Sequence, residues 1–117
     1  MVVDQLTNDT TADRLFHALA DTTRRDILMR AGPESEQSVS ALARRYPMSL
    51  AAVQKHVNVL QDAGLVTKVR RGREQIVRVE PHALQTVRLL LDQLEGLWRA
   101  RLEQFEQVLD EQTKGDV

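Results

Sequence analysis

The chain has 117 residues, 42% hydrophobic and 28% charged, which is typical of a single globular domain and excludes wholesale disorder. It contains no cysteine, which excludes disulfides, thiolate metal ligands and cysteine nucleophiles. Its apolar runs are too short to span a membrane and its polar, acidic N-terminus differs from a secretory signal, so we expect a soluble, cytoplasmic protein.

The formal net charge of −1 conceals an uneven distribution of charge along the chain. Residues 36–79 carry eight Lys or Arg and three Asp or Glu, a local charge of +5 that leaves −6 for the remainder. Affinity for phosphate depends on local charge, so a basic middle is what a nucleic-acid-binding protein needs. A basic surface that is merely solvated would show the same distribution.

The first third of the chain has helical periodicity. Apolar side chains recur at three- and four-residue spacing over 11–20, which predicts a helix. The Asp-Thr-Thr run at 21–23 offers capping oxygens to a second helix, and Asp26 follows its last threonine at capping-box spacing. A Gly-Pro pair that begins at Gly32 ends this helix, and 34–38 are predicted to form a polar loop.

A short third helix is predicted to follow the polar loop. Ser38 or Ser40 can cap it, and its inward-facing side chains are Val39, Leu42 and Ala43. Pro47 sets a boundary at Tyr46, because the residue before a proline avoids the helical conformation.

The fourth helix is predicted to begin after Ser49, a favourable N-cap residue. Gly64 stands where a left-handed residue closes a helix. The apolar side chains between them recur at i, i+4 and i+7 and are Val53, Val57 and Leu60.

The periodicity then changes from helical to extended. Segments 65–69 and 75–79 are rich in β-branched residues and flank 70–74, which has Gly72 at its centre. This pattern predicts a β-hairpin with a basic tip.

Pro81 suits the first position of a last helix. Its apolar residues step by three and four, nearly as a heptad, and are Leu84, Val87, Leu91, Leu94, Trp98, Leu102, Phe105 and Leu109. A helix of about 30 residues would run roughly 45 Å, further than a domain of this size is wide. The alternative is a helix that folds back on its own core, with a break at Gly96.

The apolar stripe is larger than the rest of one chain can cover, which predicts a two-fold dimer formed by the first and last helices. The residues predicted to form the dimer are Leu15, Leu91, Leu94, Trp98, Leu102 and Phe105.

In this order the elements predict a mainly α fold with a small β-hairpin. The predicted fold is a winged helix-turn-helix with a long terminal dimerisation helix. We expect one domain over 11–112, with the dimerisation helix at 81–112. Flexible ends are expected at 1–10 and 113–117.

Such a fold predicts a sequence-specific binder of double-stranded DNA. The fourth helix would enter the major groove, and the hairpin would contact the backbone or the minor groove. For His56, at the edge of the core stripe, a packed role, a DNA contact and metal ligation all stay open. The predicted DNA-binding residues are Ser49, Ala51, Ala52, Gln54, Lys55, His56, Asn58, Arg70, Arg71, Gly72 and Arg73.

Other classes of function fit the sequence less well. The alternative is a winged helix that serves only protein–protein contact, which should expose apolar residues on the fourth helix, where Leu50 alone fits. No nucleophile elbow or phosphate-binding loop is present, so we expect no enzyme activity. No cofactor motif appears, and three histidines on separate segments without cysteine predict a protein that works without a metal.

Several stretches resemble motifs of ArsR-type bacterial repressors. The matching stretches are ALADTTRRDIL at 18–28, VSALA at 39–43, MSLAAVQKHVNVL at 48–60, AGLV at 63–66 and RGRE at 71–74. Near the C-terminus, Trp98 is followed by an Arg-Leu pair that begins at Arg101. This pattern resembles the C-terminal sequence of one branch of the family, which lacks the metal sites. The resemblance covers about residues 14–110.

This resemblance implies a homodimer that binds an inverted-repeat operator and represses transcription. Gln54 and Lys55 depart from the family's pattern before the motif's histidine, so a base preference does not carry over. The metal-sensing branch has paired cysteines before the turn, and the matching segment 42–46 has none. The last helix offers only His82, Asp92 and Glu95, without a second histidine.

Overall fold

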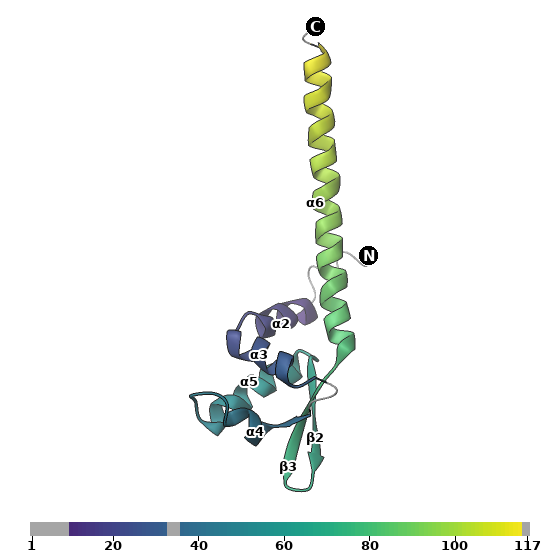
Figure 1. Cartoon of the computed structure of the whole chain (residues 1–117). Coiled ribbons are helices and arrows are strands. Elements are labelled where there is room, and N and C mark those ends of the chain that lie inside the picture. Colours follow the sequence, from purple (N-terminus) through teal and green to yellow (C-terminus); the bar gives the residue numbers. More distant parts are fainter. Residues whose placement is uncertain (1–9, 33–35, 116–117) are drawn as a thin grey trace. The chain divides into compact units, whose positions relative to one another are not determined.

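The computed structural model describes residues 10–32 and 36–115, which form helices and one small antiparallel sheet (Figure 1). The chain divides into two compact units, the first ending at Val87 and the second beginning at Arg88. The predicted flexible N-terminus, except for Thr10, lies outside the described residues. Thr10 itself begins a helix.

Four helices of the first unit lie close to their predicted positions. They are α2 (Thr10–Leu19), α3 (Thr22–Arg30), α4 (Val39–Ala43) and α5 (Leu50–Asp62). Helix α4 ends before the predicted boundary at Tyr46, because Arg44 already serves as its C-cap.

Three side-chain caps fix where these helices begin. The Asp21 carboxylate accepts a hydrogen bond from the Arg24 backbone N–H at 3.0 Å, so Asp21 caps α3. The predicted capping box at the end of the 21–23 run is therefore wrong, because the helix starts two residues earlier than that box requires. Ser38 caps α4 and Ser49 caps α5, as the sequence predicts.

The sheet has three antiparallel strands in the order β1-β3-β2. Strand β1 (Gln37–Ser38) pairs with Val77 and Ile76 of β3 (Glu74–Val79), and β3 pairs in turn with β2 (Val66–Arg71). The prediction of a polar loop over 34–38 is therefore wrong for its last two residues. An extra short strand had no alternating apolar pattern by which the sequence could reveal it.

The hairpin turn is tighter than predicted. Arg71 pairs with Glu74, so the strands include most of the expected tip and only Gly72 and Arg73 form the turn. Gly72 has a φ of +64° and no non-glycine residue among those described has a positive φ, which matches a type II′ turn. This conformation places Arg73 at the extreme end of the hairpin.

The core of the first unit is aliphatic and closes on α5. Val53, Val57 and Leu60 are fully buried, which confirms the predicted core stripe. They pack in one cluster with residues from α2, α3, α4 and the sheet. Gly64, at a φ of +77°, ends α5 in the left-handed conformation that the sequence predicts.

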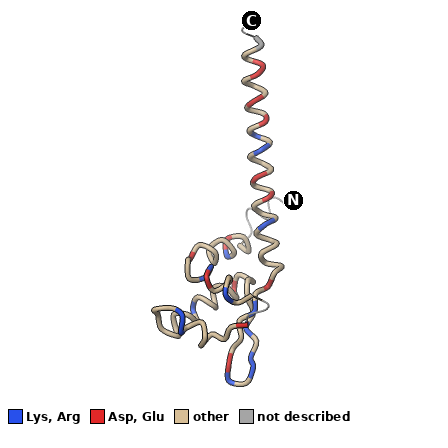
Figure 2. Tube along the Cα trace, in the orientation of Figure 1, with Lys and Arg blue, Asp and Glu red and all other residues tan. Residues whose placement is uncertain are grey.

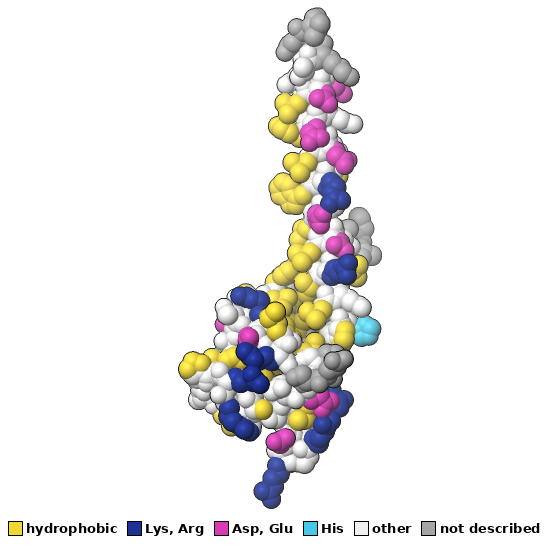
Figure 3. Space-filling model, in the orientation of Figure 1, with side chains coloured by type: hydrophobic (Ala, Val, Ile, Leu, Met, Phe, Trp, Pro, Cys, Tyr) yellow, Lys and Arg dark blue, Asp and Glu magenta, His cyan; other side chains and the backbone are white. Residues whose placement is uncertain are grey.

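Helix α6 (Pro81–Gly115) is a single uninterrupted helix. It passes through Gly96 without a break, and it continues beyond the predicted end at residue 112, because nothing before Gly115 interrupts the helical sequence. Figure 3 shows hydrophobic side chains along one side of this helix and charged ones along the other. Its large apolar side chains with 39–61% exposure after residue 90 are Leu91, Leu94, Leu97, Trp98, Leu102, Phe105, Val108 and Leu109.

Candidate nucleic-acid interface

A hydrogen bond outside the predicted motifs fixes the turn between α4 and α5. The Tyr46 hydroxyl donates to the Asp26 carboxylate on α3 at 2.6 Å, and Arg30 donates to the same oxygen at 2.7 Å. Burial, together with this carboxylate, raises the pKa of Tyr46 to about 12. The tyrosine thus keeps its proton and holds the residue before Pro47 against α3, which fixes the turn that leads to the Ser49 cap of α5.

The exposed face of α5 carries most of the residues that the sequence assigns to DNA. Leu50, Ala51, Gln54, Lys55 and Asn58 are exposed, and all lie outside the buried stripe. The remaining α5 candidates, Ala52 and His56, are half-buried, and the N-cap Ser49 is exposed. The structure therefore brings the small and polar candidates together on one helical face.

Asn58 has a partner that sequence reasoning missed. Lys68 of β2 donates a hydrogen bond from Nζ to Oδ1 of Asn58 at 2.7 Å. This contact joins α5 to the hairpin and engages one lone pair of the amide oxygen, so the second lone pair and the amide N–H groups are left for an outside partner.

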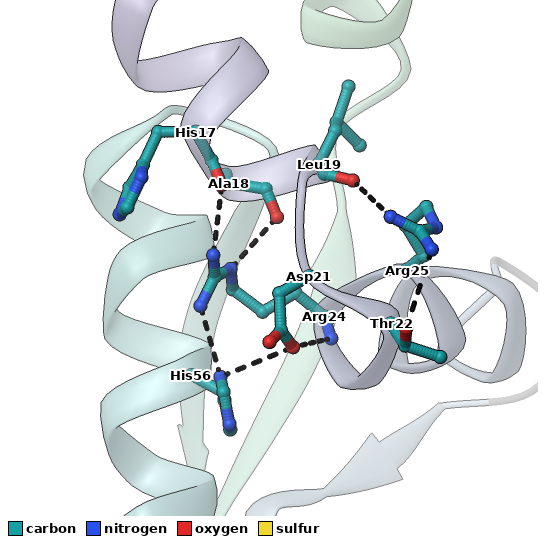
Figure 4. Close-up of polar contacts among 8 residues, drawn as sticks. All are labelled: His17, Ala18, Leu19, Asp21, Thr22, Arg24, Arg25 and His56. Carbon is teal, nitrogen blue, oxygen red and sulfur yellow. Dashed lines mark hydrogen bonds and ion pairs between the residues drawn. The ribbon is translucent and has the colours of Figure 1, made fainter.

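His56 is held inside the domain through one ring nitrogen. Its Nδ1 lies 3.2 Å from a terminal nitrogen of Arg24 and 3.8 Å from a carboxylate oxygen of Asp21 (Figure 4). A guanidinium can only donate, so Nδ1 accepts and the neutral ring carries its proton on Nε2. The packed role left open by the sequence is thus present, and the outer nitrogen remains a donor.

Arg24 connects three helices. Its side chain donates to the backbone oxygen of Ala18 at 2.8 Å and to that of His17 at 2.9 Å, at the end of α2, as well as contacting His56 on α5 (Figure 4). The last carbonyls of a helix lack partners within it, so the guanidinium satisfies them. The hydrogen bond from the Arg24 backbone N–H lowers the pKa of Asp21, and the guanidinium's charge adds to this.

Basic positions gather on the hairpin (Figure 2), and its arginines differ in the contacts that they make. Arg71 and Arg78 both form ion pairs with Glu36, at 2.7 and 3.3 Å, which ties the hairpin to the segment before β1. Arg70 makes only a long contact, 3.4 Å, to the Gly72 carbonyl. Arg73 is exposed in the turn itself, so Arg70 and Arg73 are better placed than Arg71 to contact an outside anion.

The start of α5 and the hairpin border a shared groove. Its volume is about 290 Å³, and it is lined by Val39, Ser40, Leu50, Gln54, Arg70, Arg73 and Gln75. Two arginines, two glutamines and one exposed leucine thus converge on one opening. We call this opening the basic groove.

One residue assigned to the dimer interface is in the wrong place. Leu15 is 1% exposed and lies in the core of the first unit, because the apolar face of α2 packs against its own domain. Its neighbour Phe16 is 40% exposed. The five α6 candidates, by contrast, are all exposed.

Within 10–32 and 36–115, no group of three or more His, Cys, Asp or Glu side chains is arranged to hold a metal ion. In the same part of the chain, no helix has the length and apolar character needed to cross a membrane.

Comparison with known proteins places this arrangement in a family. A helix-turn-helix domain model matches residues 19–69. The chain is 36% identical over 104 residues to the HTH-type transcriptional regulator Rv2034 of Mycobacterium tuberculosis, covering 89% of this chain and 92% of that protein. An ArsR-like transcriptional regulator from Rhodococcus sp. RHA1 is 35% identical, with a TM-score of 0.81 over 91% of this chain and 96% of the other. The chain belongs to the ArsR family of helix-turn-helix transcriptional regulators.

A further solved structure shares the winged fold. It is a homodimeric winged helix-turn-helix DNA-binding domain from Mycobacterium bovis, 28% identical, with a TM-score of 0.58 over 79% of this chain and 83% of that one. This family confirms the predicted fold class, and the absence of cysteine from the sequence is consistent with the branch that lacks metal-sensing cysteines.

Proposed function

We propose that this ArsR-family regulator is a homodimeric repressor that binds an inverted-repeat operator in double-stranded DNA. The observation that carries the proposal is the basic groove, where Gln54 of α5 and two hairpin arginines line one opening. Glutamine and arginine supply the two kinds of contact that sequence-specific binding needs, one to base edges and one to phosphates.

In this proposal α5 enters the major groove by its N-terminal half. The small side chains of Ala51 and Ala52 let the backbone approach the bases, and Ser49 with the free N–H groups of the helix start favours a phosphate. Gln54 and Lys55 reach base edges or phosphates from the exposed face. Asn58 can join them through its amide N–H groups or through the second lone pair of its oxygen, since the first accepts from Lys68.

The hairpin supplies the second contact. Arg73 at the turn and Arg70 beside it would contact the DNA backbone or the minor groove. Arg71 would contribute charge without a free guanidinium, since Glu36 already engages it. His56 would offer Nε2–H to a phosphate, because its other nitrogen faces Arg24.

A second copy of the chain is the proposed occupant of the apolar side of α6. Trp98, Leu102 and Phe105 are 59–61% exposed on one side of the helix, and isolated soluble domains rarely expose apolar patches of this extent. The homodimeric M. bovis domain supports the same assembly. Two copies would present two α5 helices to successive turns of DNA, roughly 34 Å apart.

The protein would act as a DNA-binding repressor and not as an enzyme. It would act in the cytoplasm, where it would repress transcription by occupying an operator.

Selection of bound fragments from random-sequence DNA, using the full chain, tests the proposal. We expect an enriched motif with inverted symmetry. The Gln54→Ala variant should bind that motif with discrimination relaxed at particular base pairs, by roughly 1–3 kcal/mol. Enrichment of no motif, or of a motif unaffected by Gln54→Ala and Arg73→Ala together, would place the function elsewhere.

A further inference from the structure

The exposure of Leu50 has no structural explanation within the domain. Leu50 is the first residue of α5 and is 49% exposed, although Val53, three residues later on the same helix, is fully buried. Full burial of a leucine side chain stabilises a fold, and here half of that burial is missing. The side chain lines the basic groove instead of completing the core.

Leu50 and Gln54 form a pair along the helix. They are four residues apart, so their side chains lie on the same face, one turn from each other. Both line the basic groove. Four residues rise about 6 Å along the axis, which is between one and two steps of about 3.4 Å in duplex DNA. Side chains at this spacing reach base pairs one or two steps apart.

The edges of an A·T pair in the major groove match these two side chains. Thymine presents a C5-methyl group, to which an aliphatic side chain makes apolar contact, and adenine presents N6 and N7, to which a glutamine amide bonds bidentately. A G·C pair presents no methyl group and offers nothing to a leucine side chain. The exposed leucine in an otherwise polar groove is therefore complementary to thymine.

We propose that Leu50 is a specificity-determining residue that recognises the 5-methyl group of a thymine, beside an adenine bound by Gln54. The inference rests on the proposed function, and it adds that the operator must contain a thymine at the position that Leu50 contacts. The same exposed leucine would also suit a docked protein, but Arg70 and Arg73 line the groove beside it with no acidic residue among its described lining, and Gln54 lies on the same helical face. This set favours DNA, because arginines pair with phosphates and glutamine bonds to base edges.

Deoxyuridine substitution tests the proposal, since it removes only the methyl group of thymine. Each thymine of the selected operator is replaced in turn, and dissociation constants are measured for the wild type and for Leu50→Ala. We expect one position in each half-site where deoxyuridine weakens wild-type binding about fourfold, the value for one buried methyl group. At that position Leu50→Ala should bind thymine and deoxyuridine equally.

Met29→Ala is the matched control, because Met29 is 84% exposed on α3 and does not line the basic groove. It should keep the wild-type deoxyuridine profile, and thermal unfolding should show both variants folded. Wild-type binding that tolerates deoxyuridine at every position would overturn the proposal, and so would a loss that persists in Leu50→Ala.

The proposal would also be overturned if Leu50→Ala bound every operator as tightly as the wild type does. Protein contact would then remain as the role of the side chain. A wild-type chain that enriches no DNA in the selection would contradict the proposed function itself. That outcome is distinguishable from a chain that binds DNA without sensing the methyl group.

Discussion

The two units of the chain treat their large apolar side chains in opposite ways. In the first unit, Leu15, Ile27 and Leu42 are at most 1% exposed. In the second, Leu102 and Phe105 are 59% and 61% exposed. One unit completes a core from its own helices and sheet, whereas the other is one helix with a bare apolar side.

This difference separates what one chain can stabilise from what needs a partner. Burial of a Leu or Phe side chain contributes about 1.5–3 kcal/mol, which the first unit gains within itself. An isolated helix gains nothing of this kind, and helices without tertiary contacts are marginal in water. The proposed DNA-contacting surface therefore belongs to a self-sufficient unit, while the proposed symmetry of the regulator depends on α6.

The largest effect should come from charging the apolar side of α6. We expect Trp98→Glu with Leu102→Glu to give a monomeric mass by sedimentation at micromolar concentration. Operator affinity should fall about 100-fold or more, because two linked half-sites gain that factor from effective concentration. The first unit should stay folded by circular dichroism.

The matched control adds the same two charges elsewhere on α6. Gln104→Glu with Gln107→Glu should leave the dimer intact, because at 3.6 residues per turn these positions face away from Trp98 and Leu102. A double charge on the apolar side that leaves the mass dimeric would contradict the proposed interface.

A smaller effect is expected at the hairpin. Arg73→Ala should weaken operator binding about tenfold, the value of one charge-assisted hydrogen bond. If the partner is a phosphate, the slope of log affinity against log salt should fall by about one. Arg78→Ala is the control, because Glu36 engages that arginine within the domain. Equal losses in the two variants would show that general charge, rather than the turn position, determines binding.

The cap of α3 should affect stability by less. Asp21→Ala should lower the free energy of unfolding by about 1 kcal/mol at pH 7, because it removes the capping oxygen, and thermal unfolding measures this loss. The folded-state pKa of Asp21 is lowered, so its contribution is present above its unfolded-state pKa, near about 4, and disappears as pH falls through the folded value. The wild type and variant should therefore converge in Tm at lower pH.

Thr23→Ala separates the observed cap from the predicted capping box. Because Asp21 accepts the capping hydrogen bond, removal of the Thr23 hydroxyl should leave Tm nearly unchanged. A larger loss for Thr23→Ala than for Asp21→Ala would mean that α3 begins where the sequence pattern placed it.

The smallest effect is expected from metals. Operator affinity should stay the same within about threefold, or about 0.7 kcal/mol, with chelator or with added zinc, nickel or cobalt. The physical reason is the ligand supply, because no cysteine is present and the histidines lie on separate segments. A saturable loss of binding at micromolar zinc that His82→Ala abolishes would contradict this.

The sequence predicted the parts of the fold that depend on local periodicity and on the residues that begin and end helices. The stripe on α5, its Ser49 cap and its Gly64 end are all encoded within a few residues of each other, and all are confirmed. Strand β1 was missed because two residues show no period, and its pairing depends on β3, which lies almost forty residues later.

Candidate residues could be selected from the sequence, but their partners could not. Nothing in local sequence indicates that Lys68 engages Asn58, or that Glu36 engages Arg71. The same limit explains Leu15, since helical spacing shows that a side chain is apolar but not whether its own core or a second chain covers it.

A hydroxyl-radical footprint of the full chain on its selected operator tests whether a dimer joined through α6 places two α5 helices on DNA. We expect two protected half-sites related by two-fold symmetry, with centres about 10–10.5 base pairs apart. The Trp98→Glu and Leu102→Glu variant should lose both half-sites together. A single protected site without symmetry, or a symmetric footprint that survives in this variant, would contradict this mode of binding.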